Sequence, residues 1–161
     1  MAAASFVLAV APVAAQVDTY PNKAIRWVIP FAPGGGTDMV ARPIAARLTE
    51  RLGQQILYDN RGGGGGVVAG EIVAKANPDG YTVSIVTPSM AIAPSIYRNL
   101  GYDPVSSFTP VAMVARSHDL FVVNAAFPAR SIQELVAYAK ANPGKINMAS
   151  GGTSQHIAGE L

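Results

Sequence analysis

The order of apolar and polar positions after residue 20 predicts strands and helices in alternation. Residues 25–31, Ile-Arg-Trp-Val-Ile-Pro-Phe, are rich in β-branched and aromatic side chains and predict a strand that ends near Pro30. In residues 37–52 an apolar residue recurs at every fourth position, which predicts a helix with one apolar face. Pro43 inside this segment is expected to kink the helix or delay its start, and Gly53 is expected to end it.

The same order then repeats along the chain. Residues 55–59 predict a second strand, residues 67–76 a second helix and residues 81–87 a third strand. Between the second helix and the third strand, Asn-Pro-Asp-Gly at 77–80 has the composition of a turn. Strands that alternate with helices in this way imply a parallel sheet with right-handed crossovers, and therefore an α/β fold.

The pattern changes after Pro94. Short apolar runs predict strands at residues 111–115, 120–123 and 145–149. Between the second and third of these runs, Ser-Ile-Gln-Glu at 131–134 is a capping box, which predicts the start of a helix with an apolar face.

A last helix is predicted to begin after residues 150–154, and the chain stops at Leu161 before any helix-ending signal. We therefore expect two αβ domains that are both short of strands. Residues 20–100 would form an incomplete first domain, and residues 101–161 the truncated start of a second. The chain is accordingly interpreted as a C-terminally truncated fragment.

Composition narrows the classes of function. Half of the 161 residues are apolar, which is typical of a chain with a packed core. The net charge is only +2, with no basic cluster interleaved with aromatic residues, so nucleic acid is not an expected partner. Because the chain has no Cys, it has neither a disulfide framework nor a thiolate metal site, and we predict no metal and no cofactor.

Residues 1–15 have the features of a signal peptide, with one exception. A short apolar core at 6–13 precedes small residues that would allow cleavage before Gln16, but no Lys or Arg stands ahead of that core. The alternative is a disordered apolar tail. Export without cysteine fits a bacterial periplasmic protein, which is the location we expect. No stretch supplies the roughly 20 apolar residues that a membrane-spanning helix needs.

Three Gly-rich or small-residue loops occupy equivalent places, each after a predicted strand and before a predicted helix. They are residues 32–38, 61–67 and 150–154. In an open parallel sheet, ligands bind at the carboxyl ends of the strands, where glycines leave backbone N–H groups accessible and helix N-termini attract anions. The loops therefore predict a site for phosphate, sulfate or carboxylate, while ordinary turn chemistry remains the alternative for each.

Motifs for nucleotide binding and catalysis are weak or absent. No P-loop, HExxH or GxSxG motif occurs. Residues 64–69 satisfy GxGxxA, but the acidic residue that the dinucleotide fingerprint requires is missing at Val86-Thr87-Pro88. The two histidines are His118, interpreted as a polar loop residue, and His156, which either faces a ligand or is a structural histidine.

Other polar side chains near the loops have two open interpretations. Asp38 either caps its own helix or contacts a ligand, and it would repel an anion unless it receives N–H hydrogen bonds or meets a cationic or hydroxyl group. Thr87, Ser89 and Met90 follow the third strand, where they either line the same cleft or belong to a solvated loop.

Several longer motifs resemble the Bug-type extracytoplasmic receptors, the binding-protein components of tripartite tricarboxylate transporters. The most specific motif is Pro-Phe-Ala-Pro-Gly-Gly-Gly-Thr-Asp at 30–38. The others lie at 20–21, 25–26, 52–54, 59–61, 74–76, 78–82, 102–104, 108–111, 149–152 and 156–161. The resemblance therefore covers the chain from Tyr20 onward. Departures from the family pattern are a missing Pro after Asn60-Arg61 and Val67-Val68 in place of a frequent Asn-Ile, which argues against a polar contact there.

The resemblance implies a Venus-flytrap fold of the type II periplasmic binding proteins, with two αβ domains around a cleft. Loop amides and ordered waters would hold a small di- or tricarboxylate or a related organic acid, and membrane permease components would be the partners of a monomeric receptor. Carried over position by position, the ligand-binding residues would be Phe31, Ala32, Pro33, Gly34, Gly35, Asp38, Gly65, Gly66, Thr87, Ser89, Met90, Gly151, Thr153, Ser154 and His156.

Three functional hypotheses follow from the sequence. The first is a receptor without catalytic residues. The second is an enzyme acting on a small phosphorylated or nucleotide substrate through the same anion loops, for which the acid-base candidates would be only Asp38 and His156. The third is a truncated gene product without a function of its own. For the isolated 161-residue chain we expect marginal stability and weak binding, because a flytrap uses both of its faces to hold a ligand.

Overall fold

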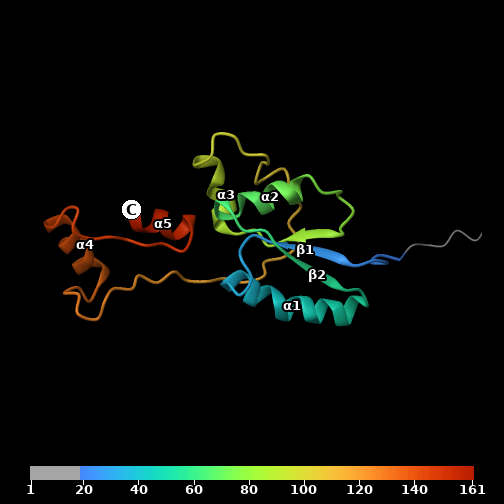
Figure 1. The fold of residues 1–161 in the computed structure, drawn as a ribbon, viewed down its shortest axis with the longest axis horizontal. Helices are drawn as coiled ribbons and strands as arrows, with labels where there is room; N and C mark the ends of the chain where they lie inside the picture. Colours follow the sequence, from blue (N-terminus) through green and yellow to red (C-terminus); the bar gives the residue numbers. More distant parts are fainter. Residues whose placement is uncertain (1–18) are drawn as a thin grey trace, which may run out of the picture.

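A computed structural model describes residues 19–161 and contains a three-stranded parallel sheet. The strands are β1 (Ile25–Ile29), β2 (Ile56–Asn60) and β3 (Thr82–Ser84), in the order β2-β1-β3 (Figure 1). β1 pairs with β2 along its whole length but with β3 only from Arg26 to Val28. The third strand is therefore shorter than the predicted 81–87, because only these positions have a partner on β1.

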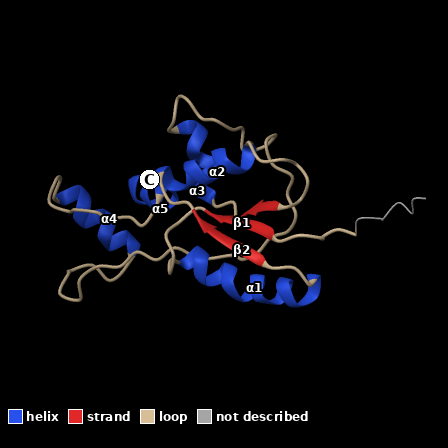
Figure 2. Cartoon of the chain, turned by 45° about the vertical axis from the view of Figure 1, so that its right-hand side comes forward, coloured by secondary structure: helices blue, strands red, loops and turns tan. Residues whose placement is uncertain are grey.

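Two helices cover opposite faces of the sheet, as Figures 1 and 2 both show. α1 (Gly36–Leu52) connects β1 to β2, and α2 (Val67–Ala74) connects β2 to β3 after the short 3-10 turn Gly64–Gly66. Alternate residues of β1 form the core with α1. The buried members of this core are Ile25, Trp27, Ile29, Ala41, Ala45 and Ile56.

For α1, the predicted end at Gly53 is confirmed, whereas the delayed start predicted from Pro43 is wrong. Gly53 follows the helix in the left-handed region, at φ +66°, and ends it as predicted. Pro43 does not delay the start, because the helix already begins at Gly36. The ring is tolerated since Pro43 lies on the exposed side of α1, where the carbonyl that loses its partner can bond to water.

The segment after β3 packs on α2. It contains α3 (Pro88–Ile92) and the 3-10 turn Ala93–Ser95, and it leads to Tyr102, which is buried against Gly70. A β-carbon at Gly70 would lie 2.5 Å from the Tyr102 ring, so only glycine permits this contact. The Tyr102 hydroxyl donates a hydrogen bond to the Met90 carbonyl at 3.2 Å and ties the segment to α3.

The second part of the chain contains α4 (Ile132–Ala141) and α5 (Thr153–Glu160). The capping box is confirmed at α4: the Ser131 hydroxyl accepts a hydrogen bond from the Glu134 N–H at 3.2 Å. The Glu134 carboxylate reaches back to the Arg130 N–H at 2.6 Å, one residue before the usual position in this motif.

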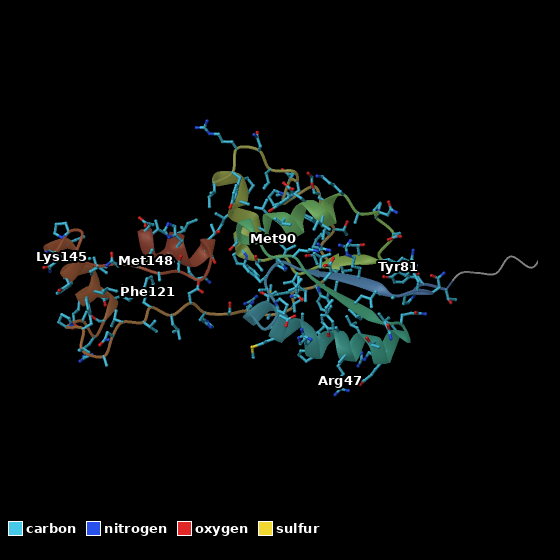
Figure 3. All side chains as sticks on the ribbon, in the orientation of Figure 1. Arg47, Tyr81, Met90, Phe121, Lys145 and Met148 are labelled. Atoms are coloured by element: carbon cyan, nitrogen blue, oxygen red, sulfur yellow. The ribbon has the colours of Figure 1, made fainter. Side chains whose placement is uncertain are left out.

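The strands predicted at 111–115, 120–123 and 145–149 are wrong, since all three segments are irregular (Figure 2). A strand needs a neighbour for its backbone N–H and C=O groups, and no described strand pairs with these segments. Their apolar side chains are correspondingly exposed, Val111 at 90% and Leu120 at 85%. Phe121 and Met148 mark two of these segments in Figure 3.

α5 returns toward the sheet and packs against α3, although the two helices are far apart in sequence (Figure 1). No helix among residues 19–161 is long and apolar enough to span a membrane. The proposed signal peptide at 1–15 lies outside the described residues, and the division of the chain at residue 100 stays a prediction.

Candidate functional site

The Gly run after β2 meets the segments after β3 and before α5. A β-carbon at Gly65 would lie 2.8 Å from Thr153 Oγ1 and 3.7 Å from the Ser89 β-carbon. Residues from three separate segments, each at or just before the start of a helix, therefore converge at one point. Gly65, Ser89 and Thr153 were all among the site residues implied by the sequence.

Glycine is required in this run for two reasons. Gly65 and Gly66 have φ of +64° and +101°, in the left-handed region that side chains disfavour. A β-carbon at Gly66 would also lie 2.9 Å from Met90 Cγ and 3.2 Å from Pro30 Cβ. The close approach of this run to the side chains of Met90 and Pro30, at the carboxyl end of β1, thus depends on the missing side chain of Gly66.

The residues after β3 differ in what they can offer a ligand. Met90 is fully buried, so its side chain belongs to the core rather than to a ligand surface. Ser89 is 5% exposed, and its hydroxyl lies 3.7 Å from the position that a β-carbon on Gly152 would occupy. The Thr87 hydroxyl is buried and makes no hydrogen bond within residues 19–161. Thr87 therefore carries an unused polar atom at the start of α3.

The loop after β1 is ordered by Asp38. Its carboxylate is 1% exposed and accepts hydrogen bonds from the Gly34 N–H at 2.9 Å and from Arg42 Nε at 2.8 Å. The Gly34 N–H, followed by the Arg42 guanidinium, holds the pKa of Asp38 below its usual range. The N-cap itself is Gly35, without a side-chain cap, so Asp38 acts from inside the first turn of α1.

Asn60 is a residue that sequence reasoning missed. Its amide nitrogen donates to the Phe31 carbonyl at 3.0 Å and to Asp38 Oδ1 at 3.4 Å. Asn60 directly follows a predicted strand, and the carboxyl ends of parallel strands meet at one edge of the sheet. This position in the sequence could have identified Asn60 as a candidate site residue. Ala32 and Pro33 are exposed in the same loop, and Phe31 is half-buried.

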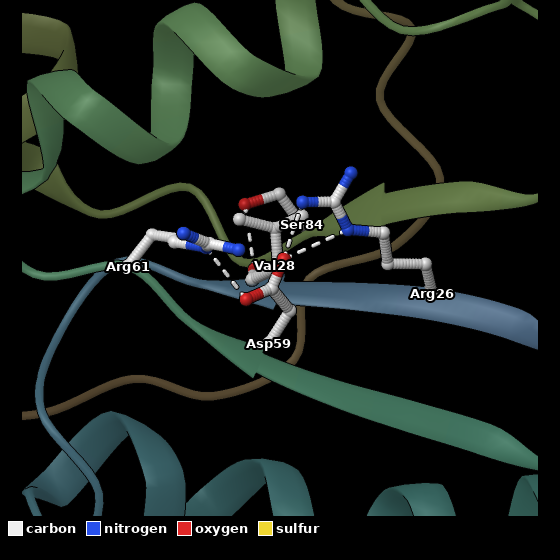
Figure 4. A network of polar contacts seen from close by, with 5 residues as sticks. All are labelled: Arg26, Val28, Asp59, Arg61 and Ser84. Carbon is white, nitrogen blue, oxygen red and sulfur yellow. Dashed lines mark hydrogen bonds and ion pairs between the residues drawn. The ribbon is translucent and has the colours of Figure 1, made fainter.

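A second polar network lies on the sheet next to the Gly run (Figure 4). Asp59 accepts hydrogen bonds from Arg26 Nε at 2.8 Å and from Arg61 Nε at 2.6 Å. Burial raises the pKa of Asp59, but the hydrogen bonds and charges of the two arginines outweigh it and hold this pKa below its usual range. Ser84 donates to the Val28 carbonyl at 2.9 Å and joins β3 to this network.

The loop before α5 supplies the third edge of the site. Gly152 is the N-cap of α5, and Gln155 in its first turn donates to Asp119 Oδ1 at 2.9 Å. His156 is 58% exposed and lies 3.9 Å from Glu160, on the same helix. Gly151 is exposed and Ser154 half-buried, its hydroxyl bonded to Gln155. The first-turn N–H groups of α5 have no intrahelical acceptor, which suits an anion.

Within residues 19–161, no three His, Cys, Asp or Glu side chains are grouped as a metal site requires. The site consists of glycine loops, hydroxyl groups and helix N-termini. This donor set can hold an anion through neutral hydrogen bonds, without a cationic side chain at its centre.

Comparison with known proteins places the chain in a family. Residues 40–161 match the model described as "Tripartite tricarboxylate transporter family receptor". BugT of Bordetella pertussis is 35% identical over 167 aligned positions, covering 100% of this chain and 51% of BugT. The chain spans about half the length of the curated relatives it matches.

Two solved structures are similar in fold as well as in sequence. Rpa4515 of R. palustris with adipate superposes with a TM-score of 0.77 at 40% identity, covering 88% of this chain and 48% of that one. MatC of Rhodopseudomonas palustris with bound malate gives a TM-score of 0.63 at 34% identity, covering 76% and 42%.

The chain belongs to the TctC family of tripartite tricarboxylate transporter receptors. Its fold is that of the periplasmic binding proteins of this family, as the α/β pattern and the motif at 30–38 predicted. The family consists of solute-binding receptors rather than enzymes, so the enzyme alternative is not retained.

Proposed function

We propose that this chain serves in a periplasmic receptor that captures a small di- or tricarboxylate, or a related organic acid, for a tripartite tricarboxylate-type transporter. The observation that carries the proposal is the convergence of Gly65, Ser89 and Thr153 from three segments that each lie at or just before the start of a helix. Neutral donors gathered at helix N-termini suit a carboxylate, since each N–H can donate without a permanent counter-charge.

The chemistry of similar proteins supports the ligand class. One similar structure holds adipate and another holds malate, both of them small dicarboxylates. The loops at 31–38, 64–66 and 151–156 would bind one carboxylate, and the buried Thr87 hydroxyl would donate to the same ligand or to a water beside it. The residues proposed to contact the ligand are those given in the sequence analysis, with two exceptions: Met90 would contribute only its backbone, and the buried Asp38 would order the loop without touching the ligand.

The remaining parts of the proposal follow from the family. Permease components of the transporter would receive the ligand, export would depend on the signal peptide at 1–15, and the receptor would act as a monomer.

The proposal is tested by saturation-transfer NMR of the full chain with adipate and malate. Glycerol 3-phosphate and AMP, whose carbon-bound protons can receive saturation, serve as controls for an anion site of another class. We expect weak saturation transfer to both dicarboxylates and none to AMP. Transfer to AMP or glycerol 3-phosphate with none to either dicarboxylate would contradict the proposed ligand class.

A further inference from the structure

The loop between β1 and α1 is held at two points by side chains from different elements. Asp38 accepts the Gly34 N–H at 2.9 Å, and Asn60 donates to the Phe31 carbonyl at 3.0 Å. The two side chains also contact each other, Asn60 Nδ2 to Asp38 Oδ1 at 3.4 Å. One hydrogen-bonded pair therefore fixes both ends of the loop.

The two side chains are themselves fixed by the scaffold. Asp38 forms an ion pair with Arg42 one turn further along α1, and the Arg42 carbonyl accepts from the Tyr58 hydroxyl at 3.1 Å. Asn60 is the last residue of β2 and pairs in register with Ile29. A loop pinned to a helix and to a central strand pair has little freedom to change conformation.

The geometry argues against Asp38 as a ligand contact. The carboxylate is 1% exposed, and both of its oxygens already accept hydrogen bonds from the chain. Arg42 balances its charge at 2.8 Å, so that an anionic ligand can approach the loop without meeting an uncompensated carboxylate.

We propose that Asp38 and Asn60 are positioning residues, which fix loop 31–35 so that the free N–H groups at the start of α1 are preorganised for a carboxylate. This inference rests on the proposed function. Preorganised donors bind more tightly because the loop loses no further conformational freedom on binding.

The experiment compares amide spectra of the full ¹⁵N-labelled chain and four variants, with adipate as the probe. The variants are Asp38→Ala, Asp38→Asn, Asn60→Ala and the matched control Asp103→Ala. Asp103 also orders a turn, by accepting the Val105 and Ser106 N–H groups, but it lies outside the loop. Solvent exchange of the Gly34 amide reports on the loop without any ligand, and adipate-induced shifts of residues 35–37 report on binding.

We expect Asp38→Ala to speed exchange of the Gly34 amide about tenfold or more, as loss of a charge-assisted hydrogen bond predicts. Adipate shifts at 35–37 should shrink in Asp38→Ala and Asn60→Ala, while Asp38→Asn, which keeps an acceptor oxygen, should recover part of the protection. Asp103→Ala should match the wild type in both measurements.

The experiment distinguishes failure of the positioning role from failure of the proposed function. Unchanged Gly34 exchange in Asp38→Ala, or full adipate shifts at 35–37 despite faster exchange, would overturn the positioning role and leave the proposed function standing. If Asp38→Ala does not fold, as judged from the amides of β1–β3, Asp38→Asn and Asn60→Ala decide the same question. An absence of adipate shifts in the wild type would overturn the proposed function and this inference together.

Discussion

Gly65 and Thr153 are in contact although they are far apart in the sequence, one following β2 and the other at the start of α5. A β-carbon on Gly65 would be 2.8 Å from Thr153 Oγ1, closer than real contacts allow. The Gly run after β2 and the N-terminus of α5 therefore meet only because residue 65 has no side chain. The receptor that we propose would hold its ligand where these two parts of the chain approach one another.

Gly65→Ala is expected to displace Thr153 and to weaken carboxylate binding. Gly53→Ala is a matched control, since Gly53 has a nearly identical φ of +66° but no atom within 4 Å of its β-carbon position. Both variants should lose about 1–2 kcal/mol of stability from the left-handed backbone. Only Gly65→Ala should also reduce adipate binding measured by NMR titration. Equal binding by the two variants would show that the contact with Thr153 is unimportant.

Gly70→Ala is expected to destabilise the fold, because its β-carbon would lie 2.5 Å from the Tyr102 ring. Overpacking of this kind costs about 1–3 kcal/mol, more than the roughly 1 kcal/mol that alanine gains over glycine in a helix. Urea unfolding followed by Trp27 fluorescence measures the change, because Trp27 is the single tryptophan and is buried in the core. Gly36→Ala, with no atom within 4 Å, should leave the midpoint unchanged or raise it slightly.

The stability of the fold should depend on pH partly because Arg26 and Arg61 stabilise the ionised form of Asp59. Its pKa is lowered in the folded state, so its stabilising contribution is complete above the usual Asp pKa and is lost as pH falls through the lowered value. Asp59→Asn should remove this part of the acid dependence and cost about 1 kcal/mol at neutral pH. Parallel acid-unfolding curves of the variant and the wild type would contradict the assignment.

Exposed apolar side chains in the second part of the chain should bind a hydrophobic dye. Val111, Leu120 and Val122 are exposed at 90%, 85% and 85%. ANS fluorescence should therefore be high under native conditions and should fall in Leu120→Ser/Val122→Ser, with Trp27 fluorescence unchanged. Low ANS fluorescence of the wild type would mean that these residues are covered in solution.

The sheet and the helices that position the first loops were predictable from local pattern. The period of the apolar residues located β1, α1, β2 and α2 within about two residues, and Gly53 and Ser131 marked a helix end and a helix start. These features depend on residues close in sequence, which explains why sequence reasoning reached them.

Features that depend on distant residues were not predictable. The apolar runs at 111–123 have the composition of strands but no described strand to pair with. Composition alone therefore led to a wrong prediction of strands there. Asn60 contacts Asp38 across 22 positions of sequence, and no local pattern announces that hydrogen bond. The candidate site could therefore be located by its loops, while the side chains that hold those loops required the structure.

The most direct test of the central claim is an amide-shift titration of the full ¹⁵N-labelled chain with malate. The account predicts saturable shifts confined to three regions, residues 32–37, 64–66 and 152–154, with one common dissociation constant. Shifts in only one of these regions, or none at all, would contradict a shared carboxylate site.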